Sequence, residues 1–271
     1  MLTLLGCRGT TPVSGEKYIK YGGNTPSVFV PLNEQECLII DCGTGINKIN
    51  FSDFLTYKKY HIFFTHLHWD HIIGLPTFKV LYNSEAEINI YVQDKSLDYP
   101  FLFIKHLFNP PYFPVSHNML KADIRYNLVK PGGTYNFGRV KLTSMEGFHP
   151  NKSLVYKLFF DNFEVVFATD YEHSRVDSEL IAFSKNAKYL IFDTTYLPED
   201  FEGKHDGISK KGWGHSTYVH GVDFAVRADV KYLVLYHHNP EYDDDALDDM
   251  LSQSKKIFSR TICSHDGMNL E

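Results

Sequence analysis

The chain has 271 residues, 43% of them hydrophobic and 15% aromatic, and a formal net charge of −6 from 27 basic and 33 acidic side chains. This apolar content can bury a sizeable core and excludes a disordered chain. The acidic balance disfavours a protein that grips long nucleic acid, although a local basic patch such as "SKKGWGH" at 209–215 stays open.

No Ser/Gly run, Pro tract or charge block marks a linker, so we expect one domain over residues 1–271. The opening "MLTLLGCRGTTP" lacks the pattern of a signal peptide, and no apolar run reaches the roughly 18–20 residues that cross a bilayer. The four cysteines show no CxxC pair and no framework spacing, which favours free thiols in a cytoplasmic protein.

Short apolar runs typical of strands recur along the chain. In order, we expect strands at 2–6, 26–32, 37–43, 61–66, 88–92, 140–146, 154–160, 163–170, 189–195 and 232–238. Helical patterns follow at 178–187, 216–229 and 244–260, the last with an acidic first turn and a basic last turn. Strands alternating with helices predict an α/β fold with layered sheets.

Polar residues stand at or just past the carboxyl ends of several of these runs, namely Asp41, His66, Asp170, Asp193 and His237. Ligands of α/β proteins gather at such strand ends. We therefore expect one site to which many strands contribute.

The stretch "FFTHLHWDHIIGLP" at 63–76 carries the strongest chemical signal, because His66, His68, Asp70 and His71 follow directly on an apolar run. In an extended turn, His66 and His68 point to one side, and Asp70 and His71 turn toward a second point. The cluster can therefore hold two cations close together, and its imidazole and carboxylate groups suit zinc, manganese or iron. The alternative is a chance run of solvated surface histidines.

"THLHWDH" also resembles the HxHxDH signature of the metallo-β-lactamase superfamily, and the resemblance extends over roughly residues 3 to 240. It implies a four-layer αβ/βα sandwich that holds two divalent metal ions, here Zn²⁺ or Mn²⁺. It also implies three further ligands: His149 in "EGFHP", a bridging Asp170 in "FATD" and a histidine in "YHHNP". Taken alone, His149 could be an ordinary loop residue and Asp170 a turn or helix-capping residue.

The last ligand is either His237 or His238. "HHNPEY" resembles a ribonuclease Z stretch when Pro240 and Tyr242 are aligned, and this alignment favours His237.

The segment 210–238 resembles the phosphodiesterase branch of the superfamily, which includes ribonuclease Z. The resemblance implies that His215 contacts the phosphate and that Asp193, in "YLIFDTTY", is its acidic partner. Such a pair keeps the imidazole in one tautomer and favours its protonated form. With Asp70, these two make up the expected catalytic residues; the alternative places His215 beside an N-capping Ser216.

Other stretches are less specific. Asp41 in "DCGTG" is expected to support a ligand histidine from outside the ligand set. Asn24, Thr25 and Ser27 in "GGNTPS" are candidate substrate contacts, although a plain turn explains them equally well. Tyr112 and Phe113, in the aromatic stretch at 108–117, could stack a base, contact a second subunit or belong to the core.

True tRNA 3′-end processors carry a long basic arm, and we find no such segment in this acidic chain. We therefore expect a metal-dependent phosphodiesterase that hydrolyses a small cyclic phosphodiester, foremost a 3′,5′-cyclic nucleotide, to the nucleoside monophosphate. The alternatives are a ribonuclease Z-like RNA endonuclease, an acyl hydrolase such as a lactonase or thioesterase, and a non-catalytic module that sequesters a nucleotide. Relatives of this branch are commonly homodimers, so we expect a homodimer.

Overall fold

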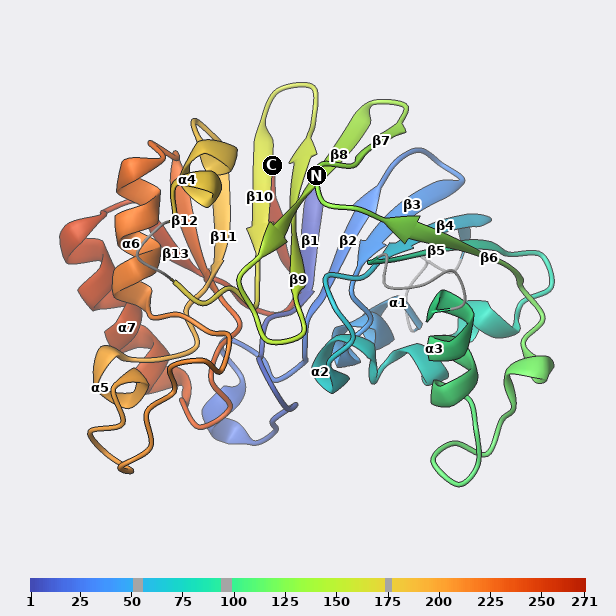
Figure 1. The fold of residues 1–271 in the computed structure, drawn as a ribbon, viewed down its shortest axis with the longest axis horizontal. Coiled ribbons are helices and arrows are strands. Elements are labelled where there is room, and N and C mark those ends of the chain that lie inside the picture. The colour runs from blue at the N-terminus through green and yellow to red at the C-terminus, as the bar shows by residue number, and fades with distance from the viewer. Residues whose placement is uncertain (51–55, 94–98, 174–176) are drawn as a thin grey trace.

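The computed structural model describes residues 1–50, 56–93, 99–173 and 177–271. Across these ranges, two seven-stranded sheets lie face to face (Figure 1). The first sheet runs in the order β14 (Met268–Leu270), β1 (Leu2–Gly6), β2 (Ser27–Pro31), β3 (Glu36–Ile40), β4 (Lys59–Phe63), β5 (Glu87–Gln93) and β6 (Asp123–Val129). The second runs β13 (Thr261–Cys263), β12 (Tyr232–Tyr236), β11 (Tyr189–Asp193), β10 (Glu164–Ala168), β9 (Ser153–Phe159), β8 (Val140–Gly147) and β7 (Thr134–Phe137).

Each sheet is parallel in one half and antiparallel in the other. β3 to β6 pair in parallel, as do β10 to β13, whereas β14–β1–β2–β3 and β7–β8–β9–β10 pair antiparallel. Parallel neighbours end at the same edge of a sheet. The carboxyl ends of β3, β4 and β5 therefore lie together, and so do those of β10, β11 and β12.

The helices cover the two outer faces. They are α1 (Asn47–Asn50), α2 (Trp69–Ile72), α3 (Tyr99–Leu107), α4 (Ser178–Ser184), α5 (Pro198–Phe201), α6 (Tyr218–Arg227) and α7 (Asp244–Ile257). Short 3₁₀ turns lie at Glu16–Tyr18, Thr44–Ile46, Leu75–Thr77, Lys79–Tyr82 and His117–Met119. α1 and α3 lie on the side of the first sheet, and α4, α6 and α7 on the side of the second (Figure 1).

Three apolar clusters correspond to the three interfaces between four layers. The middle cluster joins the sheets through side chains such as Leu4, Phe63 and Phe167. A second packs the first sheet against α3, and a third packs the second sheet against α6 and α7. The predicted four-layer αβ/βα sandwich is confirmed.

The expected strands and helices are present, with ends that differ by a few residues. The structure adds strands β6, β7, β13 and β14 and the helices α1, α2, α3 and α5, which the sequence analysis did not predict. β6 and β7 lie at sheet edges and expose alternate side chains, so neither has the continuous apolar run of a central strand.

At the N-terminus of α6, the alternative that placed His215 beside an N-capping Ser216 is wrong. Thr217 is the N-cap residue, and the Ser216 hydroxyl instead donates to the Tyr171 carbonyl at 2.7 Å. No helix among the described residues is long and apolar enough to cross a membrane.

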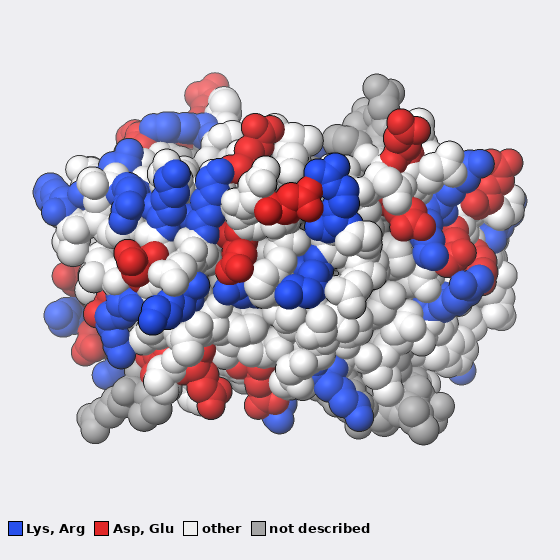
Figure 2. Space-filling view, turned by 90° about the horizontal axis from the view of Figure 1, so that it is seen from above, with Lys and Arg blue, Asp and Glu red and all other residues white. Residues whose placement is uncertain are grey.

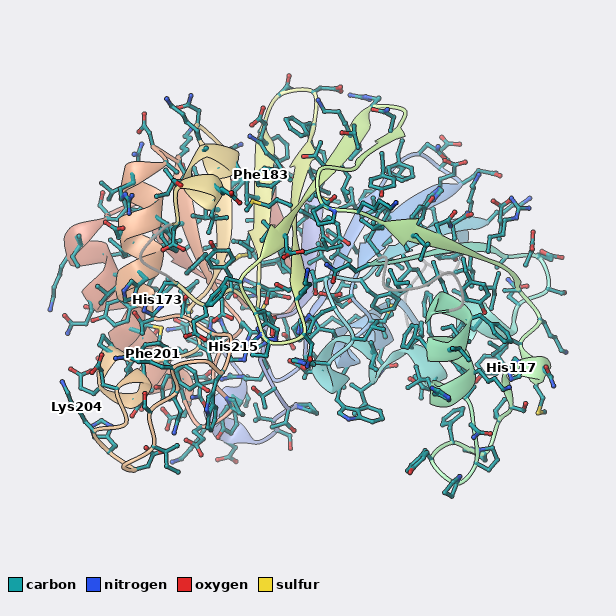
Figure 3. All side chains as sticks on the ribbon, in the orientation of Figure 1. His117, His173, Phe183, Phe201, Lys204 and His215 are labelled. Carbon is teal, nitrogen blue, oxygen red and sulfur yellow. The ribbon has the colours of Figure 1, made fainter. Side chains whose placement is uncertain are left out.

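Figure 2 views the upper end of the sheets, away from His215, which lies near the lower end in Figure 3. A row of Lys and Arg crosses this end with acidic side chains among it. Because acidic side chains lie among the basic ones, the face is not uniformly basic.

Candidate metal centre

The predicted site residues converge at the lower ends of the sheets. Asp41 follows β3 by one residue, His66 follows β4 by three, Asp170 follows β10 by two, Asp193 ends β11, and His237 follows β12 by one. Asp193 is thus the last residue of its strand, and the other four site residues stand within the first three residues of the loops that follow their strands.

Three of these residues have left-handed backbone angles, which residues other than glycine seldom adopt. Asp41, Asp170 and His237 have φ angles of 61°, 52° and 60°. Non-glycine residues in this left-handed region cost on the order of 1 kcal/mol each, and they concentrate at functional sites. Each strained residue turns its side chain directly from a strand end into the cluster.

Among the described residues, three groups of side chains offer ligand atoms that lie within 4.8 Å of one another. The first group is His66, His68, His149 and Asp170, the second is Asp70, His71, Asp170 and His237, and the third is Asp170, Asp193, His215 and His237. Asp170 belongs to all three and divides its oxygens between the first two. Its Oδ1 lies 3.6 Å from His66 Nε2, and its Oδ2 lies 3.1 Å from His71 Nε2.

The ring nitrogens that face away from the cluster have partners of their own. Nδ1 of His71 lies 2.8 Å from Asp41 Oδ2, and Nδ1 of His149 lies 2.8 Å from the Gly214 carbonyl. Nδ1 of His237 lies 3.0 Å from the Thr195 hydroxyl. A hydrogen bond at Nδ1 orients a ring and leaves Nε2 for a metal.

The donor set fits a divalent cation. Among the buried side-chain atoms that the structure describes, Nε2 of His66 and Nε2 of His71 make no hydrogen bond. Buried polar atoms rarely lack a partner, and a cation held by these groups would give both atoms one. Burial lowers the pKa of His71, but Asp170, Asp70 and Asp41 raise it well above its usual value. A divalent cation would satisfy the same excess of negative charge.

His66 differs from His71, although the two rings are neighbours with centroids 4.3 Å apart. Burial, and then the charge of His71, hold the pKa of His66 well below its ordinary value. A neutral imidazole is the form that coordinates a metal.

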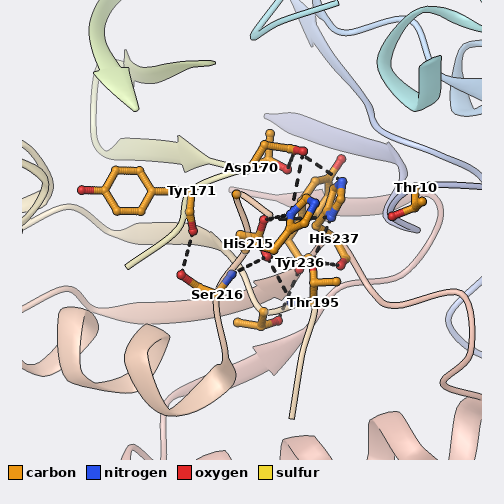
Figure 4. Close-up of polar contacts among 12 residues, drawn as sticks. Thr10, Asp170, Tyr171, Thr195, His215, Ser216, Tyr236 and His237 are labelled. Atoms are coloured by element: carbon orange, nitrogen blue, oxygen red, sulfur yellow. Dashed lines mark hydrogen bonds and ion pairs between the residues drawn. The ribbon is translucent and has the colours of Figure 1, made fainter. Parts of the chain in front are cut away.

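His215 lies beside the second group. Its Nδ1 is 2.7 Å from Asp193 Oδ2, and its ring stacks on His237 with centroids 4.8 Å apart (Figure 4). Burial lowers the pKa of His215, but the charge and hydrogen bond of Asp193 outweigh it and raise the pKa to about 9. A pKa of about 9 favours the protonated form of His215 at neutral pH, and its ring lies against the candidate metal ligand His237.

The rings of the adjacent residues His237 and His238 point to different partners. Nε2 of His237 lies 3.1 Å from Asp70 Oδ2, inside the cluster. His238 turns the other way, and its Nε2 lies 2.9 Å from the Ser264 carbonyl. Of the two, only His237 has its ring nitrogen among the candidate ligands.

Sequence reasoning missed several residues that hold the cluster together. The Thr65 hydroxyl donates to Asp41 Oδ2 at 2.8 Å, and the Thr195 hydroxyl donates to Asp193 Oδ1 at 2.8 Å. The backbone N–H of Thr10 donates to Asp70 Oδ2 at 2.9 Å. Thr65 and Thr195 stand next to predicted residues at strand ends, which is the only signal that the sequence offers for them.

The candidate substrate contacts in "GGNTPS" are not supported. Thr25 and Ser27 are fully buried, and Asn24 Nδ2 donates to Asp266 Oδ2 at 2.7 Å. Thr25 and Thr44 exchange hydrogen bonds between hydroxyl and backbone N–H. Thr25 and Ser27 are thus enclosed by the protein and cannot reach a substrate, whereas Asn24 is half-buried and its amide is bonded to Asp266.

Two other expectations concern the rim of the site. Tyr112 is 83% exposed, whereas Phe113 is half-buried against the core. The basic patch at 209–215 is largely neutralised, because Lys210 pairs with Asp206 and Lys211 lies 3.5 Å from Glu202.

The fold and the cluster at its strand ends define an αβ/βα sandwich of the metallo-β-lactamase type. Residues 38–238 match the model of the beta-lactamase superfamily domain, and the chain therefore belongs to this family. The resemblance drawn from "THLHWDH" is confirmed.

Individual relatives agree with this assignment. Ribonuclease Z of Archaeoglobus fulgidus is 26% identical over 329 aligned residues, which cover 100% of this chain and 97% of the relative. Among solved structures, the metallo-beta-lactamase fold protein YhfI from Bacillus subtilis superposes with a TM-score of 0.74 at 18% identity, covering 100% of this chain and 98% of that chain. Human tRNase Z, short form, superposes with a TM-score of 0.66 at 21% identity, with coverage of 100% and 98%. Both structures share the fold.

Proposed function

We propose that this chain is a metal-dependent phosphodiester hydrolase that binds two divalent cations, Zn²⁺ or Mn²⁺. The observation that carries the proposal is the position of Asp170, whose two oxygens face two separate groups of ligand atoms. A carboxylate shared in this way can serve one cation with each oxygen and reduce their mutual repulsion.

Each group would hold one cation. His66, His68, His149 and Asp170 Oδ1 would hold the first, and Asp70, His71, His237 and Asp170 Oδ2 the second. Two such cations, when bound, supply an activated water and neutralise charge on the phosphoryl oxygens.

His215 and Asp193 favour phosphodiester chemistry over acyl transfer. A fixed imidazolium beside the cluster can stabilise the extra negative charge of a phosphoryl transition state, or donate a proton to the leaving oxygen. Asp193 holds Nδ1 of His215, which leaves Nε2 for the substrate. Asp41 supports His71 from outside the ligand set.

For the substrate, the match to ribonuclease Z over the whole chain favours an RNA phosphodiester above the cyclic nucleotide expected from the sequence. On this view the chain cleaves RNA as its curated relative does.

A small 3′,5′-cyclic nucleotide is the second candidate, and a specific difference favours it. The alignment with the A. fulgidus protein spans 329 positions against 271 residues in this chain, so about 58 positions are present only in the relative. With a net charge of −6, the shorter chain has less surface with which to grip a folded RNA.

A groove beside the ligand loop suits a base of either substrate. A cavity of about 610 Å³ is lined by Leu67, Trp69, Ile72, Leu102, Phe103, His106, Leu107 and Tyr112. Trp69, which stands between His68 and Asp70, is 66% exposed there. Tyr112 also lines this cavity, and together with Phe113 it lines a smaller adjoining one. Aromatic side chains of this kind stack unpaired bases.

The decisive experiment supplies the purified protein, loaded with Zn²⁺ or with Mn²⁺, with precursor tRNA, single-stranded RNA and a panel of 3′,5′- and 2′,3′-cyclic nucleotides. Cleavage of RNA alone supports the first candidate, and conversion of a cyclic nucleotide alone supports the second. Tight nucleotide binding without a product would overturn the enzymatic proposal in favour of a sequestering module, and ester hydrolysis alone would favour an acyl hydrolase.

Three further proposals concern the state of the protein. We infer a single domain over residues 1–271, supported by an apolar cluster that both sheets share. A homodimer is supported by the exposed apolar side chains Trp69, Ile73 and Tyr112 on one side of the site. A cytoplasmic location is supported by four free, buried cysteines.

A further inference from the structure

Glu172 is a buried carboxylate next to the candidate metal centre, with no part in the ligand set described above. It stands two residues after Asp170 and is 7% exposed. Its Oε1 accepts the backbone N–H of Gly212 at 2.8 Å, and its Oε2 accepts that of Gly214 at 2.8 Å. Both oxygens are thus used on the loop that leads into His215.

The same residue also holds the loop of another candidate ligand. The backbone N–H of Glu172 donates to the Phe148 carbonyl at 2.8 Å, directly before His149. Nδ1 of His149 in turn donates to the carbonyl of Gly214, whose N–H is bound by Glu172. Glu172 therefore ties together the loops that carry Asp170, His149 and His215.

Neighbouring contacts lock this arrangement from the other side. The hydroxyl of Ser216 donates to the Tyr171 carbonyl at 2.7 Å and accepts the backbone N–H of His173 at 2.8 Å (Figure 4). Residues 171–173 are thus bonded to residues 212–216 on both sides of His215. Glu172 makes the contacts before it, and Ser216 makes those after it.

The geometry leaves little freedom at Gly214. Its φ is +92°, and an added Cβ would lie 2.0 Å from His149 Nδ1. The Gly214 peptide must approach the His149 ring this closely for the Gly214 carbonyl to accept the hydrogen on Nδ1. The contact therefore requires a fixed orientation of this peptide. Glu172 supplies that orientation by binding the N–H of the same residue.

We propose that Glu172 is a positioning residue that sets the ring of His149 for metal binding and sets the approach of His215 to the substrate. The part that concerns His215 rests on the proposed phosphodiesterase function. The part that concerns His149 requires only that the cluster binds a metal. Partners of this kind, outside the ligand set, typically change metal affinity or activity 10–100-fold when they are mutated.

Glu172→Gln is the informative variant, because it keeps the size of the side chain but replaces one acceptor oxygen with an NH₂ donor. That donor would face a backbone N–H, so one of the two bonds is lost and two donors oppose each other. Glu146→Gln is the matched control, since Glu146 lies nearby on β8 in an exposed pair with Lys152 at 3.1 Å. Glu172→Asp, which retains two acceptor oxygens, should restore part of the loss.

The first readout needs no substrate. Zn²⁺ affinity is measured by competition with a chromophoric chelator, at a temperature where circular dichroism shows each variant to be folded. We expect Glu172→Gln to weaken the affinity for at least one Zn²⁺ by about 10–100-fold, with Glu172→Asp in between and Glu146→Gln within about twofold of wild type. A folded Glu172→Gln protein with wild-type Zn²⁺ affinity would overturn the proposal for His149.

The second readout is turnover of whichever phosphodiester the wild type cleaves. At saturating metal, kcat should fall about 10-fold or more while KM changes less, because the clamp acts through His215 rather than through the bound base. An unchanged kcat would overturn the proposal for His215. If the wild type cleaves no phosphodiester, the proposed function fails, and the chelator experiment still decides the role of Glu172 toward His149.

Discussion

Nδ1 of His215 lies 2.7 Å from Oδ2 of Asp193, and the two residues belong to different segments near the carboxyl ends of the parallel strands of the second sheet. Asp193 ends β11, while His215 precedes α6. The other oxygen of Asp193 accepts the N–H of Thr195 at 3.1 Å and its hydroxyl at 2.8 Å. Thr195 therefore fixes the orientation of the Asp193 carboxylate, and this carboxylate holds the His215 imidazole beside the metal-ligand cluster.

Replacing this imidazole tests the class of reaction. We expect His215→Ala to lower kcat for a phosphodiester by about 10²–10⁴-fold, since a positioned acid contributes that much to proton transfer. Metal content, measured by elemental analysis, should stay at the wild-type value because His215 belongs to neither of the two groups proposed to hold a cation. Full turnover in this variant would instead favour an acyl hydrolase.

The charge of His215 makes activity sensitive to alkaline pH. The pKa of His215 is raised to about 9, so its protonated form persists at neutral pH and is lost as pH rises. Bound cations nearby would lower this pKa. We therefore expect kcat to fall with rising pH through a limb at or below about pH 9, and His215→Ala to lack this limb. A wild-type profile that keeps rising beyond pH 9 contradicts a protonated His215 in the reaction.

The neighbouring histidines 237 and 238 provide a paired test of the ligand assignment. His237→Ala should lose metal from the second group, because Nε2 of His237 lies among its ligand atoms. His238→Ala should retain metal and lose stability instead, since its ring is buried and bonded to Ser264. Elemental analysis and thermal unfolding distinguish the two, and the reverse pattern would show that the assignment is wrong.

Removing metal should destabilise the protein. A chelator would leave the buried Nε2 atoms of His66 and His71 without partners and leave the carboxylates close together. A ligand present at 100 times its Kd contributes about 2.7 kcal/mol to the free energy of unfolding. We expect a lower Tm after chelation and full recovery with Zn²⁺ or Mn²⁺. Asp41→Asn, which weakens support of His71, should shrink this recovery at limiting metal.

His61 gives a prediction about acid stability that is independent of the site. Its ring lies on β4 with its centroid 4.5 Å from that of Phe137, and burial, followed by the charge of Lys59, lowers its pKa to about 4. The unfolded chain takes up a proton near pH 6.5 and the folded chain only near pH 4, so stability falls as pH drops through this window.

We expect His61→Phe to reduce this loss, by up to about 3 kcal/mol between the two pH values. Urea unfolding at pH 7 and pH 4.5 measures the difference, and the exposed His265→Phe serves as control. Equal pH dependence in wild type and His61→Phe would contradict the assignment.

Much of the fold and of the candidate site could be predicted from the chain itself. The apolar runs that precede Asp41, His66, Asp170 and His237 are local features, because strands buried on both faces require continuous apolar side chains. The spacing from His66 to His71 is likewise local, since a turn of six residues can bring its own side chains together. Residues of this kind can be predicted from the sequence without a structure.

Tertiary structure alone decided the rest. His237 and His238 are alike in residue type, and only a family resemblance favoured His237; in the structure His237, which has a left-handed backbone, has its ring in the cluster. Thr25 and Ser27 seemed open to a substrate until packing buried them. Glu172 carries no signal in the sequence, because its partners Gly212 and Gly214 are backbone groups forty or more residues away. Such contacts depend on which distant loops pack together in the folded chain, and this packing cannot be deduced from residue type and spacing.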